Sequence, residues 1–387
     1  MFSMKVTLVS VALLSLVACD KKSPPNLLKL NLPKASKRGP IGKPISLALG
    51  GEHSCALFDS GQVMCWGAST DSQLGDTDGK KIKATHPHLL PLISDAIAID
   101  SDNNQTCVLQ KAGSVVCFGS DGGQKNMRIV QNVVGAKSIA ISESGGCARK
   151  DEAIYCWGKA DKGQIPGVLE SRLKRAKKIE KSYSKISASG SSFFGKSAMG
   201  WEGWGGNPGR IFRKVSQELN GFTKIKGSAE FDNIISRDAV ACGITSKDVR
   251  CWGRLGNKKA KKNEVGGDAT MDVAEIKAEG ISGKISKVVL GEQFGCALAD
   301  RKIWCWGSNS QGTLGDGTRQ SRALAMPVKT LESVEDVDAG DAHVCAIDKG
   351  QVFCWGDSRY SQIGVDSHLV KTEPVLLHFE DSAGKIY

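Results

Sequence analysis

The chain has 387 residues, of which 40% are hydrophobic, and carries a formal net charge of +11. Its length exceeds what one small hydrophobic core usually holds, and its one long apolar run, at the N-terminus, argues against a polytopic membrane protein. The basic balance is compatible with solubility alone or with an anionic partner.

The first residues have the pattern of an export signal. Lys5 precedes an apolar run that ends at Cys19 and is too short for a comfortable membrane span. Leu16–Cys19 resembles the lipobox of bacterial lipoproteins, which implies cleavage after residue 18 and lipidation of Cys19. The alternative is an ordinary secretory signal with a chance cysteine. We expect a signal peptide at 1–18 and a stable lipid anchor, since several acyl chains on one cysteine hold a protein to a membrane.

Residues 19–44 are predicted to be a flexible tether, because they are rich in Lys, Pro and Ser and hold few large residues. Asp20 resembles an inner-membrane retention signal of enterobacteria, which other bacteria do not obey, so the choice of membrane stays open. In an exported protein the basic surface is expected to meet anionic lipid, lipopolysaccharide or an acidic protein, and no nucleic acid.

Beyond the tether, one pattern recurs: two cysteines nine or ten positions apart, with an aromatic residue and a glycine directly after the second. Six copies keep both cysteines: Cys55 and Cys65, Cys107 and Cys117, Cys147 and Cys156, Cys242 and Cys251, Cys296 and Cys305, and Cys345 and Cys354. A seventh copy, at Ser189–Gly206, keeps Trp204-Gly205 but neither cysteine. One repeat therefore accounts for residues 45–387.

Each copy is predicted to form a β-hairpin with its cysteines directly opposite each other. Asp59-Ser60-Gly61 suits a three-residue loop whose last position needs a positive φ, and Gly113 ends the same loop in the second copy. Lys349-Gly350 suits a two-residue turn. The other three copies lack a turn glycine and are expected to form four-residue turns, around residues 151–152, 246–247 and 300–301.

The strands of these hairpins are apolar on both faces, which is typical of sheets packed between two neighbours. Apolar runs just before the hairpins, such as Ile97–Asp100, Val288–Gly291 and Val337–Gly340, would then be the inner strands of each sheet. Seven such units predict an all-β fold, a seven-bladed β-propeller; a superhelical array is the structural alternative. The cysteine hairpin is expected on the outside of its blade, with Trp66 packed against the next blade.

Three segments resemble repeats of the regulator of chromosome condensation family: GGEHSCALFDSGQVMCWGASTDSQLGD, LGEQFGCALADRKIWCWGSNSQGTLGDGT and AGDAHVCAIDKGQVFCWGDSRYSQIG. These are the first, sixth and seventh copies, whereas the middle copies lack the Gln-Leu-Gly ending. The resemblance implies a seven-bladed propeller closed by one blade with strands from both termini. Ile45–Gly50 and Pro374–Phe379 are the candidates for that closing blade.

The twelve paired cysteines are predicted to form six disulfides within the copies. Metal sites need closer cysteine pairs or histidine companions, and dithiol redox sites need C-x-x-C; neither pattern occurs. Export favours oxidation, and the seventh copy has lost both cysteines together, as pairing within a copy predicts. Free buried thiols are the alternative.

No catalytic motif, cofactor site or metal site is apparent. His53 and His343 occupy the same repeat position, which favours a structural role, and His86 and His88 are an incidental loop pair. Two basic stretches, 171–185 and 254–264, are expected in connections between blades, where they are either solvated loops or an anionic contact surface. The candidate contact residues are Lys174, Arg175, Lys177 and Lys178.

The preferred function is a lipid-anchored, monomeric scaffold in the bacterial cell envelope, facing the periplasm or the exterior, that binds a protein or envelope component. The resemblance implies guanine-nucleotide exchange as an alternative, which export contradicts. Bacterial propellers with similar repeats also include a secreted enzyme inhibitor and a lyase, but nothing here nominates a catalytic site.

Overall fold

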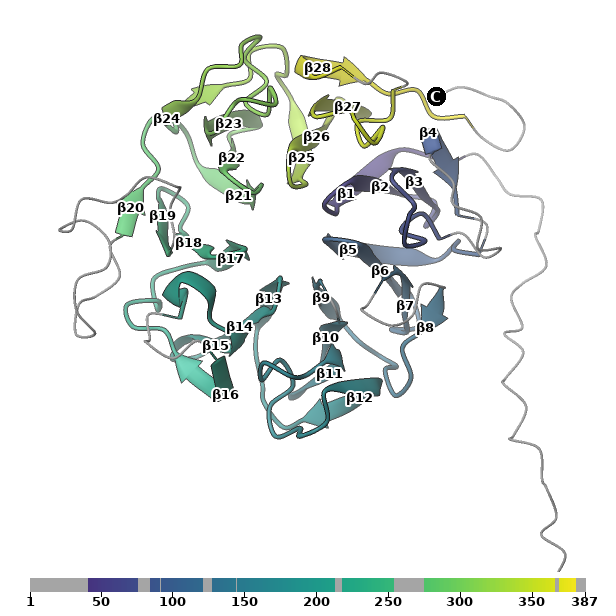
Figure 1. The fold of residues 1–387 in the computed structure, drawn as a ribbon, viewed down its shortest axis with the longest axis vertical. Coiled ribbons are helices and arrows are strands. Elements are labelled where there is room, and N and C mark those ends of the chain that lie inside the picture. The colour runs from purple at the N-terminus through teal and green to yellow at the C-terminus, as the bar shows by residue number, and fades with distance from the viewer. Residues whose placement is uncertain are drawn as a thin grey trace, which may run out of the picture. The chain divides into compact units, whose positions relative to one another are not determined.

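The computed structural model describes residues 41–75, 84–90, 92–120, 127–143, 145–212, 218–253, 275–365 and 369–380. These residues belong to one compact unit, Lys37–Tyr387. They form seven four-stranded antiparallel sheets, each built from consecutive strands, and one short 3₁₀ turn, η1 (Pro208–Arg210). We number the sheets as blades one to seven in chain order (Figure 1).

The first two strands of each blade pair as neighbours. The first strands are β1 (Pro44–Leu49), β5 (Ala96–Asp102), β9 (Ser138–Ser142), β13 (Lys185–Ser189), β17 (Asn233–Arg237), β21 (Ile285–Leu290) and β25 (Val334–Ala339). The second strands are β2 (His53–Phe58), β6 (Gln105–Gln110), β10 (Gly145–Lys150), β14 (Ser192–Ser197), β18 (Val240–Ile244), β22 (Phe294–Ala299) and β26 (His343–Asp348).

The third and fourth strands complete each sheet outwards (Figure 1). The third strands are β3 (Val63–Gly67), β7 (Val115–Gly119), β11 (Ala153–Lys159), β15 (Gly200–Gly206), β19 (Val249–Gly253), β23 (Lys302–Gly307) and β27 (Gln351–Gly356). The fourth strands are β4 (Ala84–Leu89), β8 (Arg128–Ile129), β12 (Arg172–Ile179), β16 (Glu218–Lys224), β20 (Glu275–Lys277), β24 (Arg322–Pro327) and β28 (Lys371–Leu376).

The predicted seven-bladed β-propeller is confirmed, and the superhelical alternative is excluded because the ring closes. Each first strand contacts the first strand of the following blade, and β25 contacts β1 (Figure 1). Seven hydrophobic clusters fill the interfaces between successive blades, including the one between blades seven and one. Both faces of every sheet are therefore buried, as the apolar strands predicted.

The predicted closing blade is wrong. β1 belongs to blade one and β28 to blade seven, so within the described residues no sheet combines strands from both ends of the chain. Side chains close the ring instead: Phe379, after β28, packs edge-on against Phe58 and Trp66 of blade one, with ring centroids 5.3 and 5.9 Å apart. A hydrogen bond between the first turns of blades seven and one also joins them: the Asp341 amide donates to Gly51 O. Residues 41–44 also contact blade one, where Lys43 N and Asp59 Oδ1 are 3.0 Å apart.

Two details of the predicted hairpins are also corrected. The cysteine hairpins form the second and third strands, so a fourth strand covers them on the outside. Trp66 packs against blade seven, the preceding blade in the ring, and its Nε1 donates to Gln362 O at 3.0 Å.

The turns at Gly61 and Gly113 have φ of 80° and 75°, as predicted. The turn around 246–247 has the four residues expected, because Ile244 pairs with Val249. The turns at 151–152 and 300–301 are instead two-residue turns, since Lys150 pairs with Ala153 and Ala299 pairs with Lys302. Asp151, Asp300 and Arg301 adopt positive φ without glycine.

Candidate functional surfaces: the basic outer strand and the central channel

All six predicted cysteine pairs are disulfides. The partners lie directly opposite each other on the second and third strands, with Cα atoms 4.0–4.1 Å apart. Each bridge is buried between two blades, so its role is structural. Cys19, the predicted lipidation site, lies outside the described residues, as does the second basic stretch at 254–264.

The first basic stretch does not lie in a connection as predicted: most of it forms β12, the fourth strand of blade three. The sequence did not predict this strand, because β12 is rich in charged residues and only its Ala176 is buried. An outermost strand needs little apolar surface, and lysines on such a strand oppose pairing with another chain. β12 therefore presents cations from a hydrogen-bonded strand at the rim.

The four candidate contact residues on β12 differ in how their charges are used. Lys177 Nζ donates to Gly167 O at 2.8 Å. Lys178 Nζ lies 2.7 Å from Glu180 Oε1, and this hydrogen bond raises the pKa of Lys178. Lys174 and Arg175 are exposed, and their side chains have no ion-pair partner among the residues that the structure describes. These two residues, the basic pair, are the cations left free for a partner.

The repeat-position histidines join blades, in agreement with a structural role. His53 Nε2 lies 2.6 Å from Thr106 Oγ1 in blade two, and His343 Nε2 lies 2.8 Å from Ser54 Oγ in blade one. Burial lowers the pKa of His53 to about 3 and that of His343 to about 4, so both are neutral near pH 7. A Cβ at Gly50 would overlap the His53 ring, which explains the glycine three residues earlier.

His86 and His88 do not act together. His88 Nε2 lies 3.0 Å from Leu74 O, whereas His86 Nδ1 lies 3.0 Å from Thr85 Oγ1 beside it. Across the described ranges, we find no group of three or more His, Cys, Asp or Glu side chains that could hold a metal ion. The same ranges contain no helix with the length and hydrophobicity of a membrane span.

A central channel of about 390 Å³ runs between the first strands of the blades. Aspartates on these strands accept hydrogen bonds from the unpaired edge of the next blade. Asp338 Oδ2 accepts from Leu49 N at 2.7 Å, and Asp100 Oδ2 accepts from Ile141 N at 2.8 Å. Edge N–H groups that would lack a partner are thereby satisfied. Sequence reasoning missed this role: Asp100 and Asp338 stand in the apolar runs Ile97–Asp100 and Val337–Gly340, but nothing in the local sequence identifies their partners.

The channel carboxyl groups have unusual proton affinities. Burial, together with the charges of Asp338 and Asp102, raises the pKa of Asp100 to about 7, although its hydrogen bond from Ile141 opposes the rise. Burial likewise raises the pKa of Asp102 and of Asp338 to about 6, although Arg237 and Lys287 respectively oppose the rise. Perturbed carboxyl groups that line a cavity are typical of functional sites, although structural networks also produce them.

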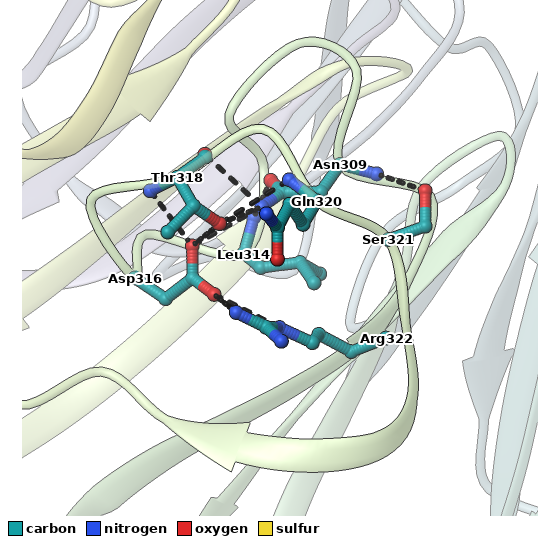
Figure 2. A network of polar contacts seen from close by, with 7 residues as sticks. All are labelled: Asn309, Leu314, Asp316, Thr318, Gln320, Ser321 and Arg322. Atoms are coloured by element: carbon teal, nitrogen blue, oxygen red, sulfur yellow. Dashed lines mark hydrogen bonds and ion pairs between the residues drawn. The ribbon is translucent and has the colours of Figure 1, made fainter.

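The loops between third and fourth strands clamp the tryptophan of the following blade. In blade six the buried Asn309 organises the loop: its Oδ1 accepts from Leu314 N at 3.0 Å, and its Nδ2 donates to Asp316 Oδ1 at 3.1 Å (Figure 2). Thr313 O then accepts from Trp355 Nε1 at 2.9 Å. Trp66, Trp204 and Trp252 donate to equivalent loops of the blades before them.

Asp316 holds the loop of blade six together as an ionised group (Figure 2). Burial would raise its pKa, but hydrogen bonds from Thr318 and from Arg322 lower it overall. The Leu-Gly element of this loop, Leu314-Gly315 in blade six, therefore belongs to the interface between blades.

The fold and these interfaces define a seven-bladed β-propeller in which six blades are crosslinked internally and successive blades are joined by buried polar contacts. Within it, residues 300–347 match one family model of the Regulator of chromosome condensation (RCC1) repeat, and residues 45–73 and 334–362 match a second model with this description. The matches fall in blades one, six and seven, where the resemblance was predicted.

The chain is 24% identical over 325 residues to the mouse E3 ubiquitin-protein ligase HERC2, which covers 78% of this chain but only 6% of that protein. Among solved structures, Prp20p from Saccharomyces cerevisiae aligns with a TM-score of 0.52 at 16% identity, covering 87% of this chain and 77% of that one. The CRINKLY ectodomain of the Arabidopsis thaliana receptor kinase ACR4 aligns with a TM-score of 0.51 at 16% identity, covering 85% and 98%. At these identities the structures show a shared fold alone.

Proposed function

We propose that the chain is a lipid-anchored binding scaffold of the bacterial cell envelope, with a signal peptide at 1–18, lipidation at Cys19 and a tether that leads into the propeller. The six disulfides support this placement, because such bridges persist in oxidising compartments. The ectodomain of a receptor kinase uses the same fold, which is compatible with a role outside the cytoplasm.

The basic pair carries the binding proposal. Lys174 and Arg175 are exposed cations on a rim strand and form no ion pair in the described structure, so their charges are available to an acidic protein or anionic envelope component. The solved Prp20p structure is described with that protein's binding to Gsp1p and histones. Nothing in the geometry of this chain favours exchange activity over general protein binding.

Anchoring is tested by fractionating cells that express the wild type or Cys19→Ala. We expect the wild type in the membrane fraction with six disulfides, and the variant released in soluble, oxidised form. Soluble wild-type protein in the cytoplasm with reduced thiols would overturn the placement.

Binding is tested with the soluble Cys19→Ala chain, so that the anchor cannot mask the contact. Lys174→Gln/Arg175→Gln should weaken cosedimentation with envelope fractions, and salt should weaken the binding of the parent chain. Lys247→Gln/Lys302→Gln removes the same charge from exposed positions on blades five and six, and should have little effect. Equal losses in the two double variants would reduce the contact to net charge and reject the basic pair.

A further inference from the structure

The loop before β12 presents a fully exposed leucine beside the basic strand. Leu169 is 102% exposed, the highest value for any large hydrophobic side chain among the residues that the structure describes. Lys177 Nζ donates to Gly167 O at 2.8 Å, so the loop that carries Leu169 lies against β12. An apolar side chain is therefore held in water next to the basic pair, and burial against a partner would be favourable.

A second segment brings apolar side chains to the outer edge of β12. Gln131 forms an isolated bridge with Arg175, and Gln131 O accepts a hydrogen bond from Ala176 N at 3.0 Å. Ile129 and Val134 flank this contact in the chain and are 43% and 63% exposed. Exposed hydrophobic residues scattered singly are ordinary, but here three of them bracket one basic strand.

The charge of β12 is one-sided. The strand contains five basic residues and no acidic residue. Lys174 and Arg175 form no ion pair in the described part of the chain, so their charges are available to a partner. Free cations attract anionic headgroups, and apolar side chains beside them enter the boundary between headgroups and acyl chains. An acidic protein would use the same cations but would need a separate apolar pocket for Leu169.

The proposed anchor keeps a bilayer within reach of this surface. The chain between Cys19 and Ile41 adds about 22 residues, which extend to at most about 75 Å. A domain of about 350 residues has a radius of gyration of about 20 Å, so the rim at β12 can turn towards the membrane while the lipidated end stays inserted. The linked surface then acts at a high effective concentration, and even weak lipid binding is enough to orient the propeller.

We propose that β12 and its flanking segments form a membrane contact for anionic phospholipid, in which Lys174 and Arg175 bind headgroup phosphates and Leu169 inserts beneath them. The inference rests on the proposed envelope anchoring and names the partner of the basic pair. Ile129 and Val134 extend the apolar part of the contact at the outer edge of the strand. Because β12 lies on the rim, this contact would leave both faces of the propeller open to a protein partner (Figure 1).

The test is cosedimentation of the oxidised, soluble Cys19→Ala chain with vesicles of phosphatidylcholine and phosphatidylglycerol, compared with vesicles of phosphatidylcholine alone. We expect binding to the anionic vesicles only, weakened by salt. Lys174→Gln/Arg175→Gln should weaken it by about ten- to thirtyfold, since each cation near an anionic surface contributes about a factor of five. Leu169→Gln should weaken it by about three- to tenfold, because it removes the inserted apolar side chain.

Leu324→Gln is the matched control, because Leu324 is 54% exposed on the fourth strand of blade six. It should change vesicle binding by less than about twofold. Equal losses for Leu169→Gln and Leu324→Gln would reject the inserted leucine, and equal binding to both kinds of vesicle would reject recognition of headgroup charge.

The same variants separate this inference from the proposed function. If the chain ignores anionic vesicles while Lys174→Gln/Arg175→Gln still weakens cosedimentation with envelope fractions, the basic pair binds a protein or lipopolysaccharide and the lipid contact is wrong. If the double variant weakens neither kind of binding, the basic pair itself is rejected.

Discussion

Blades two and four hold the same hairpin together in different ways. Blade two joins its central strands through the Cys107–Cys117 disulfide. In blade four the equivalent positions are Phe194 and Gly203, which lie opposite each other on β14 and β15. Phe194 packs edge-on against Phe212 with centroids 5.2 Å apart, and a Cβ at Gly203 would overlap that same ring. A covalent bridge and an aromatic cluster are therefore alternative solutions at one repeat position.

One channel-facing position also differs between these two blades, in the direction of the hydrogen bond that it makes to the next blade. Asp100 of blade two accepts from a backbone N–H of blade three. Ser187, at the equivalent position of blade four, instead donates to Ile234 O of blade five at 2.6 Å. At this position blades two and four therefore both bond to the next blade, but blade two does so with a carboxyl group that accepts and blade four with a hydroxyl group that donates.

The largest expected change in the free energy of unfolding comes from a variant that tests whether aromatic packing replaces the disulfide in blade four. Trp204 stacks between Tyr183 and Phe193, with centroids 5.6 Å from each. Trp204→Ala should lower the free energy of unfolding by about 3–5 kcal/mol, as loss of a large buried ring does. Chemical denaturation of the oxidised chain measures it.

Met199→Ala is the control within the same blade, because that side chain is 76% exposed and its removal should change stability by less than about 0.5 kcal/mol. A similarly small loss for Trp204→Ala would mean that the neighbouring blades, and not its aromatic cluster, hold blade four.

The next effect concerns the charge that blade two carries and blade four lacks. The pKa of Asp100 is raised to about 7 in the folded chain from an ordinary value of 3.8. The folded state therefore binds the proton more tightly, and the stability that this provides below pH 4 is lost as the pH rises towards 7. Asp100→Asn removes this dependence, so the variant should gain stability relative to the wild type by about 2–4 kcal/mol between pH 4 and pH 8.

Denaturation curves at several pH values measure the gain, with Asp95→Asn as a control in the same blade. His53 and His343 act in the opposite direction, because their lowered pKa values make the wild type lose stability as the pH falls below 6.5. Comparing variant and wild type at each pH cancels that contribution. Parallel curves for Asp100→Asn and the wild type would show that Asp100 titrates normally.

The disulfides, the outermost strand of blade three and the channel aspartates show what the sequence can and cannot predict here. The cysteine-aromatic-glycine repeat was sufficient for seven blades and six disulfides, because opposed cysteines require paired strands. The edge strand β12 was missed because its residues are selected for solvent exposure, so they show no apolar alternation. The aspartates of the channel were missed because their partners are backbone groups of another blade, which no local pattern reports.

The smallest expected change in stability comes from replacing the aromatic packing of blade four by a disulfide. Phe194→Cys/Gly203→Cys should form a disulfide, because the two residues pair as the cysteines of the other blades do. The bridge contributes about 2–3 kcal/mol, whereas loss of the Phe194 ring costs about 3–5 kcal/mol. The oxidised variant should therefore be about 1–2 kcal/mol less stable than the wild type, since the new Cβ at position 203 also displaces Phe212.

Intact mass shows whether the new disulfide has formed. Unfolding with and without reductant separates the contribution of the disulfide from the cost of losing the Phe194 ring. Cys107→Ala/Cys117→Ala in blade two supplies the reference for a bridge removed from its native packing, with an expected loss of about 2–3 kcal/mol. If the oxidised variant were instead more stable than the wild type, the aromatic cluster would be a weaker substitute for the bridge. The expected loss means that a bridge at this position, formed while Phe212 still occupies the space beside residue 203, contributes less stability than the aromatic ring that it replaces.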